Sequence, residues 1–176
     1  MSWSSLLAQK LRPDENGNLP RLWFLLGSEP LLAIEAQDAI RAAAFKAGYS
    51  ERKSFVFEGS PLYEALGDQS LFGEKNLIEV VFPRATIGKN GPAAVEAVIE
   101  HADEDKMVVV SLFDYDWTAT KKDWFNHLMK SSVCIRTDPI DRNAVPRWIT
   151  ERAKEKNGQT LTPEAANLIA ERTEGN

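Results

Sequence analysis

The sequence predicts an α/β protein built on a five-stranded parallel sheet, followed by the start of a small helical domain. Three observations carry this prediction. Short apolar runs alternate with segments whose apolar residues recur at helical spacing. Most of these runs are apolar at nearly every position, which is typical of parallel strands covered by helices on both faces. Near residue 139 the alternation stops, and only helical spacing follows.

The first half of the chain supplies three helices and three strands. Trp3, Leu7 and Leu11 recur every four residues, which predicts a short helix near the start. Pro30 suits the first turn of a longer helix, and Gly48 suits its exit. The expected helices cover residues 2–11, 30–48 and 61–66, and the expected strands cover residues 21–26, 54–57 and 76–82.

The second half continues this alternation as far as Asp138-Pro139. Gly158 suits the end of one late helix, and Thr162 with Pro163 suits the start of the next. The expected helices cover residues 91–101, 119–130, 145–157 and 162–173, and the expected strands cover residues 107–112 and 132–136. We therefore predict an α/β domain over residues 1–140 and a helical domain, incomplete at its end, over residues 141–176.

Composition narrows the class of function. The net charge of −5 argues against a free-standing DNA binder, because such proteins are usually basic along at least one surface. Cys134 is the only cysteine, so no internal disulfide forms, which suits a reducing cytoplasm. No apolar run has the length of a membrane-spanning helix, so we expect no membrane contact.

A nucleotide site would be expected at the turn after the first strand. A phosphate-binding loop has the pattern G-x-x-x-x-G-K-[ST], because its lysine reaches the outer phosphates and its hydroxyl holds magnesium. Counted from Gly27, the last three positions hold Leu32, Ala33 and Ile34. Glu29 would also repel a phosphate at the start of the following helix. We therefore expect no ATP hydrolysis, no catalytic residue and no cofactor or metal; an ATPase domain with an atypical phosphate loop is the alternative.

Two further polar groups deserve a functional and a structural interpretation. Asp114 and Asp116 follow a predicted strand, where a pair of carboxylates could hold magnesium, but we favour a solvated loop. The arginines of the first late helix could contact DNA phosphates, although glutamates alternate with its basic residues, as on a solvated helix face. The candidate DNA contacts are Arg142, Arg147 and Arg152.

Leu71 and Phe72 are two large apolar residues on a connection between predicted elements, with polar residues on both sides. Exposed together, they would mark an interaction site, and each would contribute roughly 2 kcal/mol in a partner's pocket. The alternative is that they cap the edge of the sheet as part of the core. The pattern alone favours this alternative.

Four stretches together resemble the delta subunit family of the bacterial DNA polymerase III clamp loader. The strand-G-x-[DE]-P start, the S-L-F-[GA] segment and the P-R-W helix are characteristic, and their order and spacing also match. The stretches are LWFLLGSEPLLAIEAQDAIR (22–41), SLFGEKNLIEV (70–80), VPRWITERAKEKN (145–157) and ERTEGN (171–176).

The resemblance implies an AAA+-like sheet domain that does not bind ATP, then a helical lid domain, of which residues 141–176 form part. We expect the collar domain of the family to lie outside this chain. The family's delta subunit is a non-catalytic part of the DNA polymerase III holoenzyme, a DNA-directed DNA polymerase and therefore a nucleotidyltransferase. It acts in DNA replication in the bacterial cytoplasm, at the replisome and nucleoid.

The resemblance also implies partners and a site. Delta subunits bind and help to open the ring-shaped beta sliding clamp, and they act with the gamma/tau and delta prime subunits on primed DNA. In the family, a leucine and a phenylalanine of the S-L-F segment enter a pocket on the clamp. The matching positions here are Leu71 and Phe72, flanked by Ser70 and Gly73. Gly73 would allow close approach to the clamp.

Overall fold

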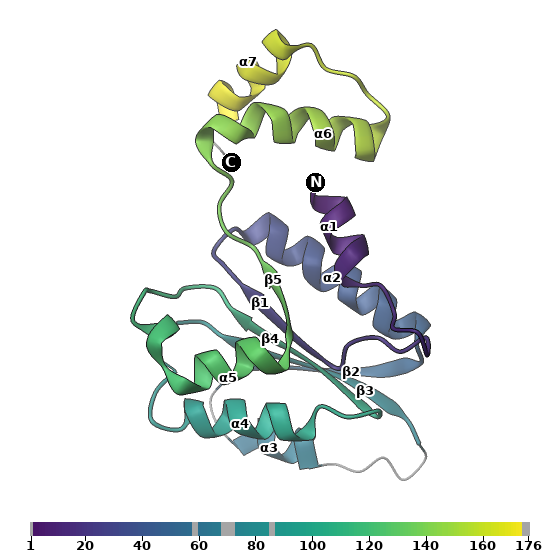
Figure 1. Ribbon diagram of the computed structural model, residues 1–176, viewed down its shortest axis with the longest axis vertical. Coiled ribbons are helices and arrows are strands. Elements are labelled where there is room, and N and C mark those ends of the chain that lie inside the picture. Colours follow the sequence, from purple (N-terminus) through teal and green to yellow (C-terminus); the bar gives the residue numbers. More distant parts are fainter. Residues whose placement is uncertain (1, 58–59, 68–72, 85–86, 174–176) are drawn as a thin grey trace. The chain divides into compact units, whose positions relative to one another are not determined.

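The computed structural model describes residues 2–57, 60–67, 73–84 and 87–173 (Figure 1). The five strands are β1 (Leu22–Leu26), β2 (Tyr49–Val56), β3 (Lys75–Phe82), β4 (Lys106–Leu112) and β5 (Val133–Arg136). The helices are α1 (Trp3–Lys10), α2 (Pro30–Lys46), α3 (Ser60–Gly67), α4 (Gly91–His101), α5 (Asp123–Ser131), α6 (Val145–Asn157) and α7 (Pro163–Thr173). Single turns of 3₁₀ helix cover Ala119–Lys121 and Arg142–Ala144.

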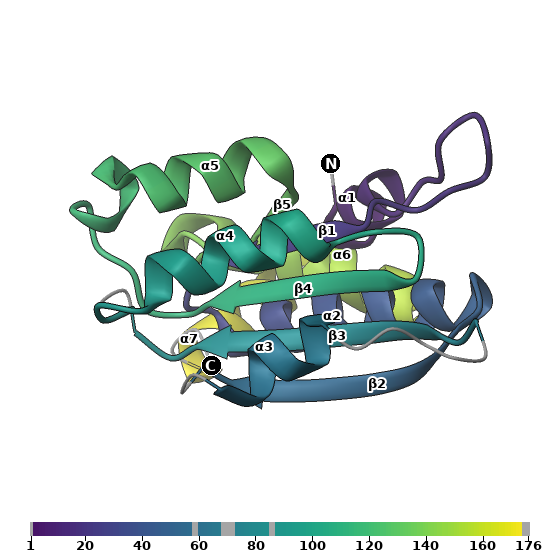
Figure 2. The ribbon, with the colours of Figure 1, turned by 90° about the horizontal axis from the view of Figure 1, so that it is seen from below.

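The strands form one sheet in the order β2-β3-β4-β1-β5, and every pairing is parallel. This confirms the predicted five-stranded parallel sheet. Connections between parallel strands are right-handed, so the direction across the sheet from one strand to the next in sequence decides which face the connecting helix covers. The chain crosses from β1 to the far edge at β2 and then returns strand by strand. Accordingly α2 covers one face, and α3, α4 and α5 cover the other (Figures 1 and 2).

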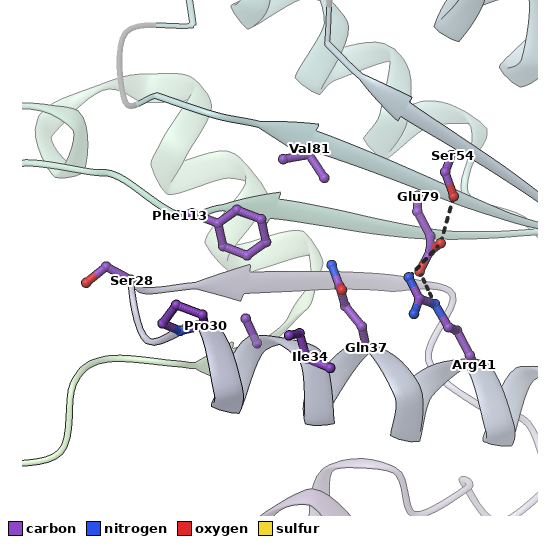
Figure 3. Close-up of a pocket in the computed structure, with 10 residues that line it drawn as sticks. Ser28, Pro30, Ile34, Gln37, Arg41, Ser54, Glu79, Val81 and Phe113 are labelled. Atoms are coloured by element: carbon purple, nitrogen blue, oxygen red, sulfur yellow. Dashed lines mark hydrogen bonds and ion pairs between the residues drawn. The ribbon is translucent and has the colours of Figure 1, made fainter. Parts of the chain in front are cut away.

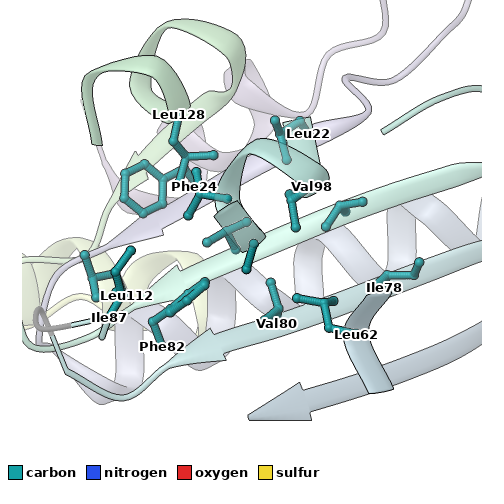
Figure 4. Packing of buried hydrophobic residues seen from close by; sticks show 14 of the residues in the cluster. Leu22, Phe24, Leu62, Ile78, Val80, Phe82, Ile87, Val98, Leu112 and Leu128 are labelled. Atoms are coloured by element: carbon teal, nitrogen blue, oxygen red, sulfur yellow. The ribbon is translucent and has the colours of Figure 1, made fainter. Parts of the chain in front are cut away.

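The main hydrophobic core lies between the sheet and the three helices α3, α4 and α5 (Figure 4). All five residues of β1 are buried, as expected for a strand with neighbours on both sides and helices on both faces. Phe24 of β1 meets Phe125 of α5 edge to face, with ring centroids 5.6 Å apart. Other members include Leu62, Ile78, Val80, Val98, Leu112 and Leu128.

Two elements differ from the sequence-based expectation. The second strand begins at Tyr49, five residues before the predicted start, because it is an edge strand whose exposed side chains include Glu51 and Arg52. An apolar run therefore marks only its end. The helix expected over 119–130 is divided, since Lys122 is extended (φ −82°, ψ 143°) between the 3₁₀ turn and α5.

The chain forms two compact units. One is the α/β unit Lys10–Asp138, which holds the sheet and helices α2 to α5. The other combines the described residues of Met1–Gln9 and Pro139–Asn176, so the first helix is grouped with the late helices. Within this second unit, Ser4 Oγ donates a hydrogen bond to Glu155 Oε2 at 2.7 Å. No helix among the described residues is both long enough and apolar enough to cross a membrane.

Candidate functional site

The S-L-F segment lies on the connection from α3 to β3. Ser70, Leu71 and Phe72 fall outside the described residues, so their exposure stays a prediction. The connection leads from the end of α3 at Gly67 to the start of β3 at Lys75. Because all strands are parallel, this connection leads to the end of the sheet at which the strands begin. The turn at Gly27 follows the end of β1 and therefore lies at the opposite end, where the strands finish.

Gly73 is exposed and adopts φ +70°. A Cβ at this position would meet no atom within 4 Å, so space does not require glycine here. The backbone conformation does, since side chains rarely adopt this left-handed region. Gly73 therefore sets the direction in which the segment enters β3.

The chain leaving this segment is fixed firmly at the start of β3. The Asn76 amide donates a hydrogen bond to the Asp105 carbonyl at 2.7 Å. The Lys75 ammonium lies 5.4 Å from the centre of the Tyr49 ring, and the Tyr49 hydroxyl donates to the Glu104 carbonyl at 3.1 Å. Burial raises the pKa of Tyr49, so its hydroxyl stays protonated and able to donate. The S-L-F segment is thus followed by a part of β3 that is tied to its neighbours by these contacts.

The glycine turn after β1 has a structural reason that involves no phosphate. Gly27 has φ +145°, and a Cβ there would lie 2.3 Å from the carbonyl carbon of Thr137. The Gly27 amide donates to the Leu112 carbonyl at 3.2 Å, and the Glu29 amide donates to the Thr137 carbonyl at 2.8 Å. The turn is therefore packed against the residue that follows β5. Only glycine allows this approach.

The start of α2 is capped by its own chain. Glu29 is the N-cap residue, and its Oε1 accepts a hydrogen bond from the Leu31 amide at 3.3 Å. A side-chain carboxylate thus occupies the end of the helix dipole where a nucleotide phosphate would bind. The positions of the missing lysine and hydroxyl, Ala33 and Ile34, lie within α2. This geometry disfavours the alternative of an ATPase with an atypical loop.

Asp116 organises the loop after β4. Its Oδ1 accepts hydrogen bonds from the Thr118 hydroxyl at 2.6 Å, the Thr118 amide at 2.8 Å and the Ala119 amide at 3.0 Å. These donors, the Thr118 hydroxyl above all, lower the pKa of Asp116. No group of three or more acidic, histidine or cysteine residues suited to a metal occurs in the described part of the chain. Asp116 shapes the loop, as the structural interpretation holds.

Of the three arginines proposed for DNA contact, Arg147 and Arg152 lie on α6 and Arg142 lies just before it. Arg142 begins the exposed 3₁₀ turn before the helix. Arg147 Nε donates to Glu151 at 2.9 Å, which confirms alternation of charge along this face. The Arg152 guanidinium lies over the Trp148 ring, 5.0 Å from its centre.

Comparisons with known proteins bear on the family. No family model matches the chain. It is 28% identical over 175 residues to DNA polymerase III subunit delta of Escherichia coli K12, covering 93% of this chain and 48% of that protein. It is 23% identical over 146 residues to the subunit delta of Haemophilus influenzae, covering 77% of this chain and 41% of that protein. The resemblance to the clamp-loader delta family is confirmed.

A solved delta structure shows the same fold. The Bacillus subtilis DNA clamp loader delta protein aligns with a TM-score of 0.66 at 18% identity, covering 95% of this chain and 50% of that one. The chain therefore has the fold of this solved delta protein. The chain spans about half the length of the curated delta subunits that it matches.

A polar network inside the α/β unit is not among the sites predicted from the sequence. Glu79 lies within the apolar run of β3, and its side chain is only 6% exposed. It accepts hydrogen bonds from Arg41 Nε at 2.8 Å, Arg41 Nη2 at 3.2 Å and Ser54 Oγ at 2.9 Å. The sequence signal for this network is a glutamate inside an otherwise apolar strand. A buried carboxylate needs a cation or hydrogen-bond donors, so such a glutamate indicates polar partners elsewhere in the chain.

Proposed function

We propose that this chain acts as a clamp-loader delta subunit, which binds the beta sliding clamp and helps to open it for loading onto primed DNA. The similarity to the Escherichia coli delta subunit over 93% of this chain carries the proposal. The S-L-F segment, Ser70 to Phe72, lies within the matching order of motifs and ends at a glycine with positive φ.

In this proposal Leu71 and Phe72 enter an apolar pocket on the clamp. Together they would contribute roughly 4 kcal/mol, at about 2 kcal/mol for each buried side chain. Binding alone does not open a ring. Delta shifts the clamp toward an open interface only by its difference in affinity for the open and closed states. The hydrogen bond from the Asn76 amide to the Asp105 carbonyl supports this role, because it ties the start of β3 to the sheet a few residues after the proposed clamp-binding pair.

The proposed partners are the beta clamp, the gamma/tau and delta prime subunits, and primed DNA within the assembly, in the bacterial cytoplasm. ATP would be bound and hydrolysed by neighbouring subunits, and this chain would be non-catalytic. The capping of α2 by Glu29 supports that division of labour. The proposal further includes an α/β domain over 1–140, lid helices over 141–176, and phosphate contacts by Arg142, Arg147 and Arg152.

The test is direct association with a purified bacterial beta clamp, measured by surface plasmon resonance. Leu71→Ala combined with Phe72→Ala is expected to weaken binding at least 100-fold, since two anchors of about 2 kcal/mol each are lost. The matched control is Leu168→Ala combined with Ile169→Ala, two consecutive exposed apolar residues on α7. This control variant is expected to bind the clamp with an affinity within twofold of wild type. Equal binding by wild type and the Leu71/Phe72 variant would refute the site.

The alternative of an ATPase domain is tested separately. Titration of the wild-type chain with fluorescent ATP and magnesium is expected to show no saturable binding in the micromolar range. Saturable micromolar binding that Glu29→Lys strengthens would favour the alternative, because this change replaces the capping carboxylate by a cation at the helix start.

A further inference from the structure

A pocket of about 440 Å³ opens on the face of the sheet that carries α2 (Figure 3). One wall is α2, with Ala33 and Ile34, and the other is formed by Val81 of β3 and Phe113 just after β4. Ser28 and Pro30 lie toward one end, and Gln37 and Arg41 toward the other (Figure 3). This volume lies within the range of pockets that hold small molecules.

The pocket follows from the topology. In the α/β unit, α2 is the helix that covers this face, whereas three helices cover the other (Figures 1 and 2). Val56 of the edge strand lies opposite Val81 in the sheet and is 60% exposed, so apolar surface continues from the pocket to the edge. Ile34, on the α2 wall, is 53% exposed. The described residues thus leave the ends of β2 and β3 open on this face.

The polar end of the pocket is a built feature. The Glu79 carboxylate is more than nine-tenths buried and is held by Arg41 and Ser54. Arg41 is shared with a second carboxylate, since Nη1 donates to Asp38 Oδ1 at 2.9 Å. Gln37 uses its Nε2 to donate to Ser111 Oγ at 3.4 Å, which turns its carbonyl oxygen away from that bond. The fixed acceptors at this end are therefore the Glu79 carboxylate and the Gln37 carbonyl oxygen.

From this geometry we propose that the pocket binds a neutral, largely apolar small molecule that carries a hydrogen-bond donor at one end. The apolar body lies between Ile34 and Phe113, and the donor meets Gln37 Oε1 or Glu79 Oε1. An anionic ligand is disfavoured, because the Asp38 and Glu79 carboxylates already pair with the Arg41 guanidinium and would compete with the ligand for it. The proposal does not depend on clamp binding, since the pocket and the S-L-F segment use different residues.

The probe is N-phenyl-1-naphthylamine, a neutral aromatic amine with one N–H donor, whose fluorescence rises in apolar surroundings. We expect saturable binding to one site per chain. Its anionic counterpart, 1-anilinonaphthalene-8-sulfonate, has the same aromatic body and is expected to bind at least tenfold more weakly.

Two variants on α2 assign the binding to the pocket. Ile34→Glu places a charge on the pocket wall at a half-exposed position and is expected to weaken probe binding at least tenfold. Phe45→Glu makes the same kind of change at an exposed position, 72% accessible, which does not line the pocket and is expected to change affinity less than twofold. Circular dichroism checks that both variants fold. Unsaturable binding, equal affinity for the sulfonate, or equal effects of the two variants would overturn the proposal.

Discussion

Arg41 on α2 and Glu79 on β3 form a bidentate ion pair between the helix and the sheet that it covers. The guanidinium donates to both carboxylate oxygens, at 2.8 and 3.2 Å. The two partners differ in burial, because the Glu79 side chain is 6% exposed and that of Arg41 is 32% exposed. Hydrogen bonding to Glu79 is the main reason that the pKa of Arg41 is raised. Loss of either partner should therefore have unequal consequences.

Arg41→Met is expected to lower the free energy of unfolding by about 3 kcal/mol, because it leaves a buried carboxylate without its main cation. Glu79→Met should cost less, since Arg41 keeps Asp38 and contact with water. The double variant should recover to within about 1 kcal/mol of wild type. Urea unfolding of all four proteins gives the comparison. Asp38→Ala, at an exposed pair, is the control and should cost about 0.5 kcal/mol or less. Equal costs for the two single variants would contradict the asymmetry.

Gly27→Ala is expected to destabilise the chain by at least about 3 kcal/mol, because the new methyl group would collide with the Thr137 carbonyl at a positive φ. Gly17→Ala is the matched control. Gly17 also has positive φ, +81°, but a Cβ there meets nothing within 4 Å. Its cost should be only about 1 kcal/mol, from the backbone conformation alone. Similar losses in urea unfolding would show that the close approach at Gly27 is unimportant.

The hydrogen bonds that Asp116 accepts in the loop after β4 should make the free energy of unfolding depend on pH in a predictable direction. Its pKa is lowered in the folded protein by hydrogen bonds from Thr118 and Ala119. A lowered folded-state pKa stabilises the protein above the unfolded value of about 3.9, and this contribution is lost as pH falls through the folded value. Asp116→Ala should therefore be less stable than wild type at pH 7, and the difference should shrink below about pH 4. A difference that grows toward low pH in denaturant titrations would contradict this.

The proposed DNA contacts predict a salt dependence in the assembled clamp loader. Arg142→Gln is expected to weaken binding of primed DNA for all sequences and to lower the slope of log affinity against log salt by about 1. Arg147→Gln should have a smaller effect, because Arg147 already pairs with Glu151 in the free chain. Fluorescence anisotropy over a range of salt concentrations measures both. Unchanged slopes in both variants would remove these arginines from the DNA-binding surface.

Sequence patterns predicted the sheet well where burial dictates residue type. The runs of β1, β3 and β4 are apolar because both faces are covered, and Gly158 with φ +66° ends α6 as its position suggested. Thr162 caps the next helix, with the Ala165 amide donating to its hydroxyl at 3.2 Å. The beginning of β2 escaped prediction because an edge strand tolerates charged residues on its open side.

Sequence patterns predict the candidate site less well than they predict the fold. Burial of the pair Leu71 and Phe72 is decided by tertiary context, and the choice between anchor and core came from the family resemblance. The pocket beside α2 is formed by residues of α2, β2 and β3 and of two connections, so no local spacing marks it. Glu79 alone gave a local signal, as a charge inside an apolar strand, but its partners Arg41 and Ser54 are 38 and 25 residues away.

The place of β1 in the sheet has a consequence for synthesis of the chain. Leu22 lies beside Val108, 86 positions later, and the other neighbour of β1 is β5, which is later still. At a translation rate of about 5–20 residues per second, roughly 4–17 s pass before the residues of β4 are made. During this interval the apolar segment LWFLL of β1 has no neighbouring strand with which to form hydrogen bonds. A nascent chain of this protein therefore carries β1 as an unpaired apolar strand until β4 leaves the ribosome.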